Sequence, residues 1–212
     1  MLRFKLLTPP AAESVTTRSE PMTAFVIADT HWGHTKSLTF FTRDGERLRP
    51  FDSVEEMDEL MVENWNRVVN NTDTVYHLGD VVIPRASLKL LGRLKGRKIL
   101  IRGNHDRYKL KDYAEHFEDI RGAHYHQPGS TFLGGLIMTH IPVHPENLQG
   151  HYRGNIHGHL HIHKVMDGEQ EDRRYFNACV ECNNFTPVAF DTVLDYFRKQ
   201  KTSAGHDMLQ QQ

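Results

Sequence analysis

Fifteen histidines stand in this chain of 212 residues, and many lie beside carboxylates or amides in short polar blocks. Five blocks follow one another along the sequence: Asp29-Thr30-His31, Gly79-Asp80, Gly103-Asn104-His105-Asp106, His140 and Gly158-His159-Leu160-His161. Imidazole, carboxylate and amide oxygen suit Mn²⁺, Fe or Zn²⁺ better than an all-oxygen Ca²⁺ site. Each block alone arises easily by chance, but their combination predicts transition-metal binding.

Strands alternating with helices must position these blocks. Three apolar, strand-like runs each end directly at a block: Phe25–Ala28, Thr74–Leu78 and Lys98–Arg102. Open α/β sheets collect ligands at such strand ends. Between the first two runs, Ser53 and Glu56 form a capping box that predicts a helix to about Asn70. Further helices are expected near 85–94 and 109–117.

The second half of the chain is richer in strands. We expect them near 120–125, 131–139, 155–156, 175–180 and 187–190, before a last helix from Asp191 to about Gln200. This order of elements predicts an α+β fold in one domain. The domain would span 22–201, between an N-terminal extension (1–21) that need not be ordered and a C-terminal tail (202–212).

The five blocks resemble, in order, the signature of the calcineurin-like metallophosphoesterase family: D-x-H, G-D, G-N-H-[D/E], a single H, and G-H-x-H. The resemblance runs from about Phe25 to Phe190. The stretches DTHWGH (29–34) and NACVECNNFTPV (177–188) look most like those of small bacterial and phage members. The fold that this resemblance implies is a four-layer α/β/β/α sandwich.

The resemblance also implies a centre of two divalent transition-metal ions, with Mn²⁺ favoured and Fe, Zn²⁺ or Ni²⁺ as alternatives. One ion would be held by Asp29, His31 and His161, the other by Asn104, His140 and His159, with Asp80 as the bridge. Two such ions clamp a phosphoryl group and generate hydroxide at neutral pH. The implied activity is therefore hydrolysis of a phosphomonoester or phosphodiester by a metal-bridging hydroxide.

Four more residues receive roles from the resemblance or from their position. His105 matches the family's position beside the leaving-group oxygen, where it would act as general acid, and Asp106 would orient its ring. Arg102 is a candidate clamp on the phosphate, or an ordinary charge at a strand end. His34 is a candidate substrate contact, or a loop histidine with structural hydrogen bonds.

Histidines at 157, 159, 161 and 163 alternate strictly. On a regular strand all four would point to one face, so spacing alone does not decide which of them bind metal. The choice of His159 and His161 rests on the match to G-H-x-H, and His157 and His163 remain flanking candidates.

Charge and cysteine content limit the other classes of function. Lys and Arg total 26 against 27 Asp and Glu, and the net charge of -1 argues against extended nucleic-acid binding. No apolar run approaches the roughly 18–20 residues of a membrane span. Cys179 and Cys182 lie in a segment expected to be extended, which disfavours a disulfide between them. We therefore expect a cytoplasmic protein without a membrane partner.

Two alternative functions remain beside the phosphoesterase. A non-catalytic scaffold on the same fold could dispense with His105, which this chain keeps, and a nuclease could act on nucleic-acid ends without a basic groove. The expected partner is a phosphate ester, either a small molecule or a nucleotide. Its identity would depend on the loops 35–50, 142–154 and 166–173. The first and last of these regions carry arginines that could meet an anionic substrate beyond the phosphate or be ordinary solvated charges: Arg43, Arg47, Arg49, Arg173 and Arg174. The sequence does not indicate an oligomeric state.

Overall fold

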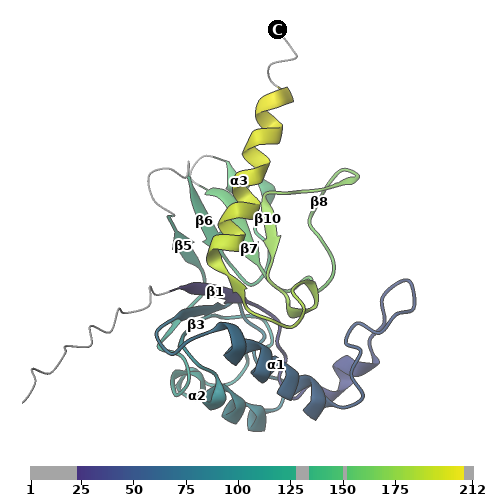
Figure 1. Cartoon of the computed structure of the whole chain (residues 1–212), viewed down its shortest axis with the longest axis vertical. Coiled ribbons are helices and arrows are strands. Elements are labelled where there is room, and N and C mark those ends of the chain that lie inside the picture. The colour runs from purple at the N-terminus through teal and green to yellow at the C-terminus, as the bar shows by residue number, and fades with distance from the viewer. Residues whose placement is uncertain (1–22, 128–133, 150–151, 208–212) are drawn as a thin grey trace, which may run out of the picture.

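Two β-sheets form the body of the protein (Figure 1), and the computed structural model describes residues 23–127, 134–149 and 152–207. A five-stranded sheet has the order β11-β1-β2-β3-β4, with β1 to β4 parallel. Its strands are β1 (Ala24–Ile27), β2 (Thr74–His77), β3 (Arg97–Ile101), β4 (Asp119–Arg121) and β11 (Val188–Ala189). A four-stranded sheet has the order β10-β7-β6-β5 and comprises β5 (His124–His126), β6 (Gly135–Met138), β7 (Tyr152–His157) and β10 (Tyr175–Asn177).

Helices and one small hairpin complete the described chain. The helices are α1 (Val54–Val68), α2 (Leu110–Ala114) and α3 (Phe190–Asp207), and the 3₁₀ segments are η1 (Thr35–Thr39), η2 (Arg85–Arg93), η3 (Pro145–Leu148) and η4 (Val180–Cys182). Strands β8 (Met166–Asp167) and β9 (Gln170–Glu171) pair in a separate hairpin. The capping box opens α1 as expected: Ser53 Oγ accepts from the Glu56 amide at 3.1 Å, and Glu56 Oε2 accepts from the Asp52 amide at 2.9 Å.

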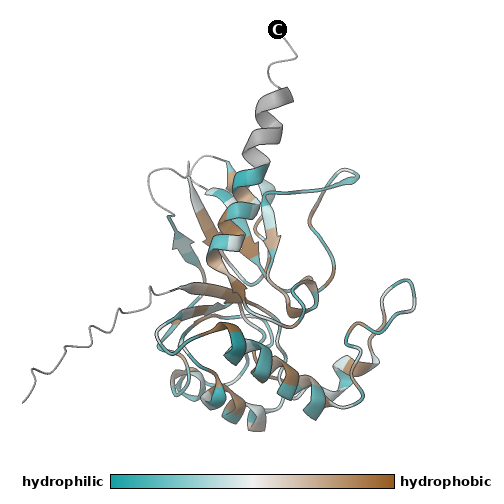
Figure 2. Cartoon of the chain, in the orientation of Figure 1, coloured by the Kyte–Doolittle hydropathy of each residue, from teal (hydrophilic) through white to brown (hydrophobic). Residues whose placement is uncertain are grey.

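Alternation along β1 separates the two apolar cores. Phe25 and Ile27 pack with α1 and η2, whereas Val26 and Ala28 pack against the facing sheet and α3. Successive residues of a strand point to opposite faces, so one short strand serves both cores. Figure 2 shows that β1 and β6 are largely hydrophobic, whereas β5 is hydrophilic and α1 carries hydrophilic residues.

The chain has the expected mixed α+β class, but the four-layer arrangement is not confirmed. Three layers can be traced: α1 with η2, the five-stranded sheet, and the four-stranded sheet (Figure 1). The apolar side chains Phe190, Val193 and Phe197 of α3 lie in the same cluster as residues of both sheets. This helix therefore contributes to the apolar core that residues of both sheets share.

Several elements differ from those expected. The single strand predicted at 120–125 is two strands, β4 and β5, which belong to different sheets. The helix near 85–94 is a 3₁₀ segment, and α3 continues through Asp207, past Gln200. The segment after β10 turns into η4 and is not extended, although both cysteines are free. The expected extension 1–21 and residues 131–133 lie outside the described residues. Within the described ranges, no helix is long and apolar enough to cross a membrane.

Candidate metal centre

The predicted ligands gather where strands of both sheets end. Asp29 follows β1, Asp80 follows β2 and Asn104 follows β3, all in the five-stranded sheet. In the other sheet, His140 follows β6 and His159 follows β7. The structure thereby brings residues from both halves of the chain to one place, as expected for strand ends that face each other.

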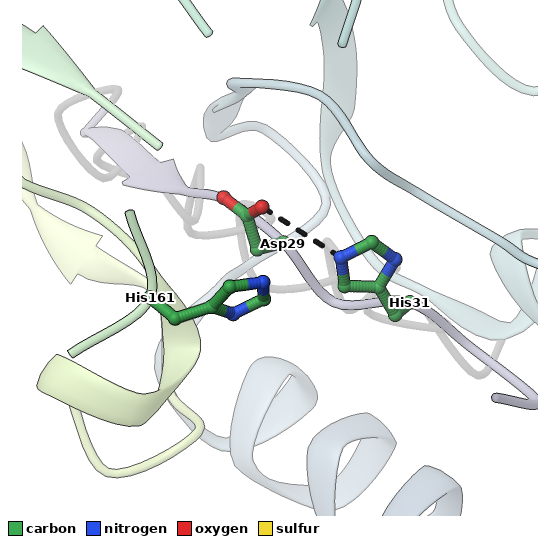
Figure 3. Close-up of side chains that lie close together, drawn as sticks. All are labelled: Asp29, His31 and His161. Atoms are coloured by element: carbon green, nitrogen blue, oxygen red, sulfur yellow. Dashed lines mark ion pairs between the residues drawn. The ribbon is translucent and has the colours of Figure 1, made fainter. Parts of the chain in front are cut away.

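Two groups of three side chains have ligand atoms close enough to hold a metal ion. One group is Asp29, His31 and His161, and the other is Asp80, His140 and His159; within each group the ligand atoms lie within 4.8 Å of one another. Figure 3 shows the first group, whose side chains point toward one another. Each group includes residues from both sheets, so each would hold its ion between them.

Asp80 lies between the two groups. Its Oδ2 atom is 3.6 Å from Nε2 of His31 and 3.5 Å from Nε2 of His140, so one oxygen faces a member of each group. Its other oxygen, Oδ1, accepts a hydrogen bond of 2.8 Å from the backbone amide of His105. This amide fixes the carboxylate and leaves Oδ2 directed at both groups.

Asn104 lies beside the second group. Its Oδ1 atom is 2.9 Å from Nε2 of His140, while Nδ1 of His140 is 2.8 Å from the Leu78 carbonyl oxygen. If the Nδ1 proton is donated to that carbonyl, Nε2 presents a lone pair to another acceptor. Two acceptors this close require a proton or a cation between them. Against the lowering effect of burial, nearby carboxylates raise the pKa of His140, so a proton on Nε2 can occupy this position, which a bound cation would take instead.

The ligand loops hold an unusual backbone conformation. Asp29, His31, Asp80, His159 and His161 have φ between 48° and 70°, and they make up five of the seven non-glycine residues with positive φ in the described chain. Residues with a Cβ adopt this left-handed region at a cost of roughly 1–3 kcal/mol each. Strain concentrated on five of the expected ligands indicates that the fold enforces their directions.

Close packing at the site explains two glycines of the sequence blocks. A Cβ on Gly103 would lie 2.3 Å from Oδ1 of Asp80, and a Cβ on Gly158 would lie 2.4 Å from Oδ2 of Asp29. Both distances are far below van der Waals contact. Glycine is therefore required at these positions because the carboxylates occupy the space of a side chain.

The charge states of Asp29 and His31 suit a cation, although neighbouring carboxylates raise the pKa of His161 against the lowering effect of burial. Burial raises the pKa of Asp29 to about 6, although His140 and His161 act to lower it, and its Oδ1 atom is buried without a hydrogen-bond partner. Burial and the nearby charge of Arg49 lower the pKa of His31 to about 2, so its ring is neutral at pH 7. A neutral imidazole beside a buried carboxylate oxygen that lacks a partner is a metal-binding arrangement.

A buried ion pair orients His161. Oε1 of Glu181 accepts from Nη2 and Nε of Arg49 at 2.7 and 2.8 Å, and it lies 3.0 Å from Nδ1 of His161. Burial acts to raise the pKa of Glu181, but His161 and Arg49 lower it to about 2. A carboxylate that accepts the Nδ1 proton leaves Nε2 as the ligand atom.

The same pair corrects the expectation for Arg49. Its side chain is 1% exposed, so it cannot meet a substrate, and it also donates to the backbone carbonyls of Asp29 and Thr30 at 2.6 and 2.9 Å. Arg49 therefore fixes the backbone of the loop that carries Asp29 and His31. No role was predicted for Glu181, which lies in the stretch 177–188, because nothing local in the sequence signals a partner 132 residues away.

Asp106 was expected to orient the His105 ring, but the partners of its carboxylate are backbone amides. Its buried carboxylate accepts from the backbone amides of Asp80, Val81 and Gly103 at 2.8–2.9 Å, so it joins two ligand loops. His105 itself is exposed, and its ring lies 5.5 Å from that of His31, edge to face.

Arg102 and His34 belong to the third and first ligand loops, respectively. Arg102 is exposed and donates to the Asp106 backbone carbonyl. The half-buried ring of His34 lies 5.7 Å from that of His31. Both residues therefore lie near the two groups, within the loops that carry the ligands.

The four alternating histidines do not share one face, because β7 ends at His157. His157 is buried and lies 2.7 Å from the Gly158 carbonyl oxygen through Nδ1, whereas His163 is exposed. The left-handed residues at 159 and 161 turn their side chains into the site. Spacing could not have shown this separation.

His77 is a further residue without an expected role. Its Nδ1 atom accepts from the Gly79 amide at 3.2 Å, and its Nε2 atom is 2.9 Å from Oγ1 of Thr30. Since that hydroxyl donates to the Val81 carbonyl at 2.9 Å, the Nε2 proton of a neutral ring completes the chain. His77 thereby connects the first two ligand loops beneath the site.

Fold and site together define an α+β protein with two facing sheets and two adjoining groups of metal-type ligands at the strand ends. Among proteins of known sequence, the chain is 30% identical to the Uncharacterized protein MJ1445 of Methanocaldococcus jannaschii over 181 residues, which cover 84% of this chain and 92% of that protein. The chain belongs to the same family as this archaeal protein.

Other comparisons add the fold but no activity. The crystal structure of a protein of unknown function from Aquifex aeolicus, AQ665, matches with a TM-score of 0.61 and 22% identity over 82% of this chain and 98% of that one, so the two share a fold. The Gene 66 protein of Mycobacterium phage L5 is 36% identical over 84 residues, 37% of each chain. A Vps29 mutant from Entamoeba histolytica reaches a TM-score of 0.38, too low to support an argument. No family model matches the chain.

Proposed function

We propose that this protein is a phosphoesterase of the calcineurin-like type that depends on two divalent metal ions and hydrolyses a phosphomonoester or phosphodiester. The observation that supports the proposal is the position of Asp80, whose Oδ2 atom faces a ligand of each group at 3.5–3.6 Å. Asp29, His31 and His161 would hold one ion, and Asn104, His140 and His159 the other. When bound, two such ions lower the pKa of water and neutralise charge on the phosphate.

The exposed His105 is the group best placed to serve the leaving group. During hydrolysis the phosphorus–oxygen ester bond breaks, and the departing oxygen needs a proton. An imidazolium at His105 can donate that proton, while its backbone amide keeps its bond to Asp80 Oδ1. Arg102 and His34 are the proposed contacts to the phosphate oxygens. Asp106 positions the loop that carries His105 through three backbone amides.

Metal content and leaving-group dependence test this function together. Chain reconstituted with Mn²⁺ is expected to bind two ions, and Asp80→Ala is expected to reduce both occupancies. His105→Ala should keep both ions and lose roughly 10²–10⁴-fold in kcat for alkyl esters, with a much smaller loss for p-nitrophenyl esters. His159→Ala is the contrasting variant, since it should lose metal first and then activity on every ester.

Three results would contradict the proposal. A wild-type chain saturated at one ion excludes the binuclear centre. Two bound ions without hydrolysis of any monoester, diester or cyclic nucleotide would favour the scaffold. Hydrolysis confined to nucleic-acid ends would favour the nuclease.

A further inference from the structure

A cavity of about 210 Å³ adjoins the first ligand group. Phe41 and Leu48, from the loop after η1, and Ile162 line it together with His161 of the ligand group. Ligand cavities are typically apolar with a few polar groups, and this one shares a wall with the candidate metal centre. A molecule bound in the cavity would therefore lie against the centre.

The loop after η1 presents aromatic rings to solvent and holds them in place. Phe40 and Phe41 are 46% and 62% exposed, although a short hairpin fixes their backbone: the Leu48 amide donates to the Phe40 carbonyl and the Thr42 amide to the Glu46 carbonyl, both at 2.8 Å. The Phe40 ring lies 5.9 Å from that of His34, edge to face. Of the two rings, that of Phe41 lines the cavity, and an exposed aromatic ring there offers a face on which a planar ligand can stack.

Arg43 also lines the cavity and differs from the other arginines of its loop. Arg47 lies 3.9 Å from Asp52 and Arg49 is buried on Glu181, whereas no carboxylate in the described ranges pairs with Arg43. Its guanidinium carries five donors and no acceptor. It is therefore available to a ligand that offers oxygen or nitrogen acceptors.

We infer that this cavity binds a planar aromatic ring system of the nucleobase class, joined to the phosphate that the proposed phosphoesterase hydrolyses; the inference thus rests on the proposed function. The ring would stack on Phe41, and Arg43 would donate to its acceptor atoms. Stacking of a base on an aromatic side chain contributes about 1–3 kcal/mol by alanine substitution, or roughly 5- to 150-fold in affinity.

Two ligands that differ in the base test the inference by isothermal titration calorimetry. They are the methylene phosphonate analogues of adenosine 5′-monophosphate and of ribose 5-phosphate, which carry the same phosphonate and cannot be hydrolysed. For the Mn²⁺-loaded full chain, we expect the adenosine analogue to bind 5- to 150-fold more tightly. Phe41→Ala should remove this preference and leave affinity for the ribose analogue within about twofold. Tyr125→Ala, which removes an exposed aromatic ring elsewhere, is the matched control and should keep the preference.

The outcomes separate the cavity from the proposed function. Equal affinities in the wild type, or a preference that persists in Phe41→Ala, would overturn the cavity assignment and leave the phosphoesterase proposal standing. If neither phosphonate binds the Mn²⁺-loaded chain, phosphate-ester binding itself fails, and both proposals fall.

Discussion

Replacement of Glu181 by glutamine tests the buried ion pair beneath the candidate centre. Oε1 of Glu181 accepts two hydrogen bonds from Arg49 and lies within hydrogen-bond distance of His161 Nδ1. The side chains of Arg49 and Glu181 are each 1% exposed. Breaking such a pair costs about 3–5 kcal/mol because the remaining charge stays buried. Since the amide oxygen of glutamine can still accept, we expect a loss near the lower limit, about 3 kcal/mol.

Metal affinity should fall in the same variant. A neutral amide holds the Nδ1 proton of His161 less strongly than a carboxylate, and loss of such a partner typically lowers metal affinity about 10–100-fold. Urea unfolding in EDTA measures the stability of the metal-free chain, and titration with Mn²⁺ measures the affinity. Glu59→Gln is the matched control, because the Glu59–Arg93 pair is half exposed and should contribute little to stability. If both variants lose equal stability and Mn²⁺ affinity is unchanged, the role assigned to Glu181 is wrong.

Four further predictions concern the loops and the chain boundary. Gly103→Ala should displace the Asp80 carboxylate and reduce bound metal in elemental analysis, with unchanged far-UV circular dichroism. Asp106→Asn should leave one buried amide without an acceptor and cost about 1–3 kcal/mol in urea unfolding. Burial lowers the pKa of His77 from 6.5 to about 3, so the unfolded chain takes up its proton first; stability should fall as pH drops from 6.5 toward 3, and less so in His77→Gln. A chain beginning at Met22 should bind as much Mn²⁺ as the full chain, since every proposed ligand lies beyond it; a loss would place the boundary elsewhere.

The resemblance to the family signature implied the two ligand sets, and the strand-like runs that end at three of the blocks predicted that those blocks lie at one edge of a sheet. The ligand atoms of Asp29, His31 and His161 do converge, and so do those of Asp80, His140 and His159. These six residues carry the signature's residue types, so no knowledge of their backbone conformation was needed to select them.

The supporting contacts could not be predicted in the same way. Glu181 and Arg49 are 132 residues apart, and Thr30 and His77 are 47 apart, so neither pairing leaves a local pattern. Asp106 lies next to His105, yet its carboxylate accepts from the amides of Asp80 and Val81 in the loop after β2 and from Gly103 in its own loop. Adjacency in the sequence suggested the His105 ring as the partner of Asp106, whereas tertiary packing places backbone amides at its carboxylate.

The division of each ligand group between the two sheets sets an order of events during folding. The Asp29 carboxylate accepts from the amide of His159, 130 residues later, so the first half of the chain cannot complete either group by itself. Contacts of such long sequence separation form slowly, because a large loop must close first. Metal uptake is therefore expected to follow the docking of the four-stranded sheet on the five-stranded sheet. Release of the proposed ions would remove an interaction that connects the two sheets.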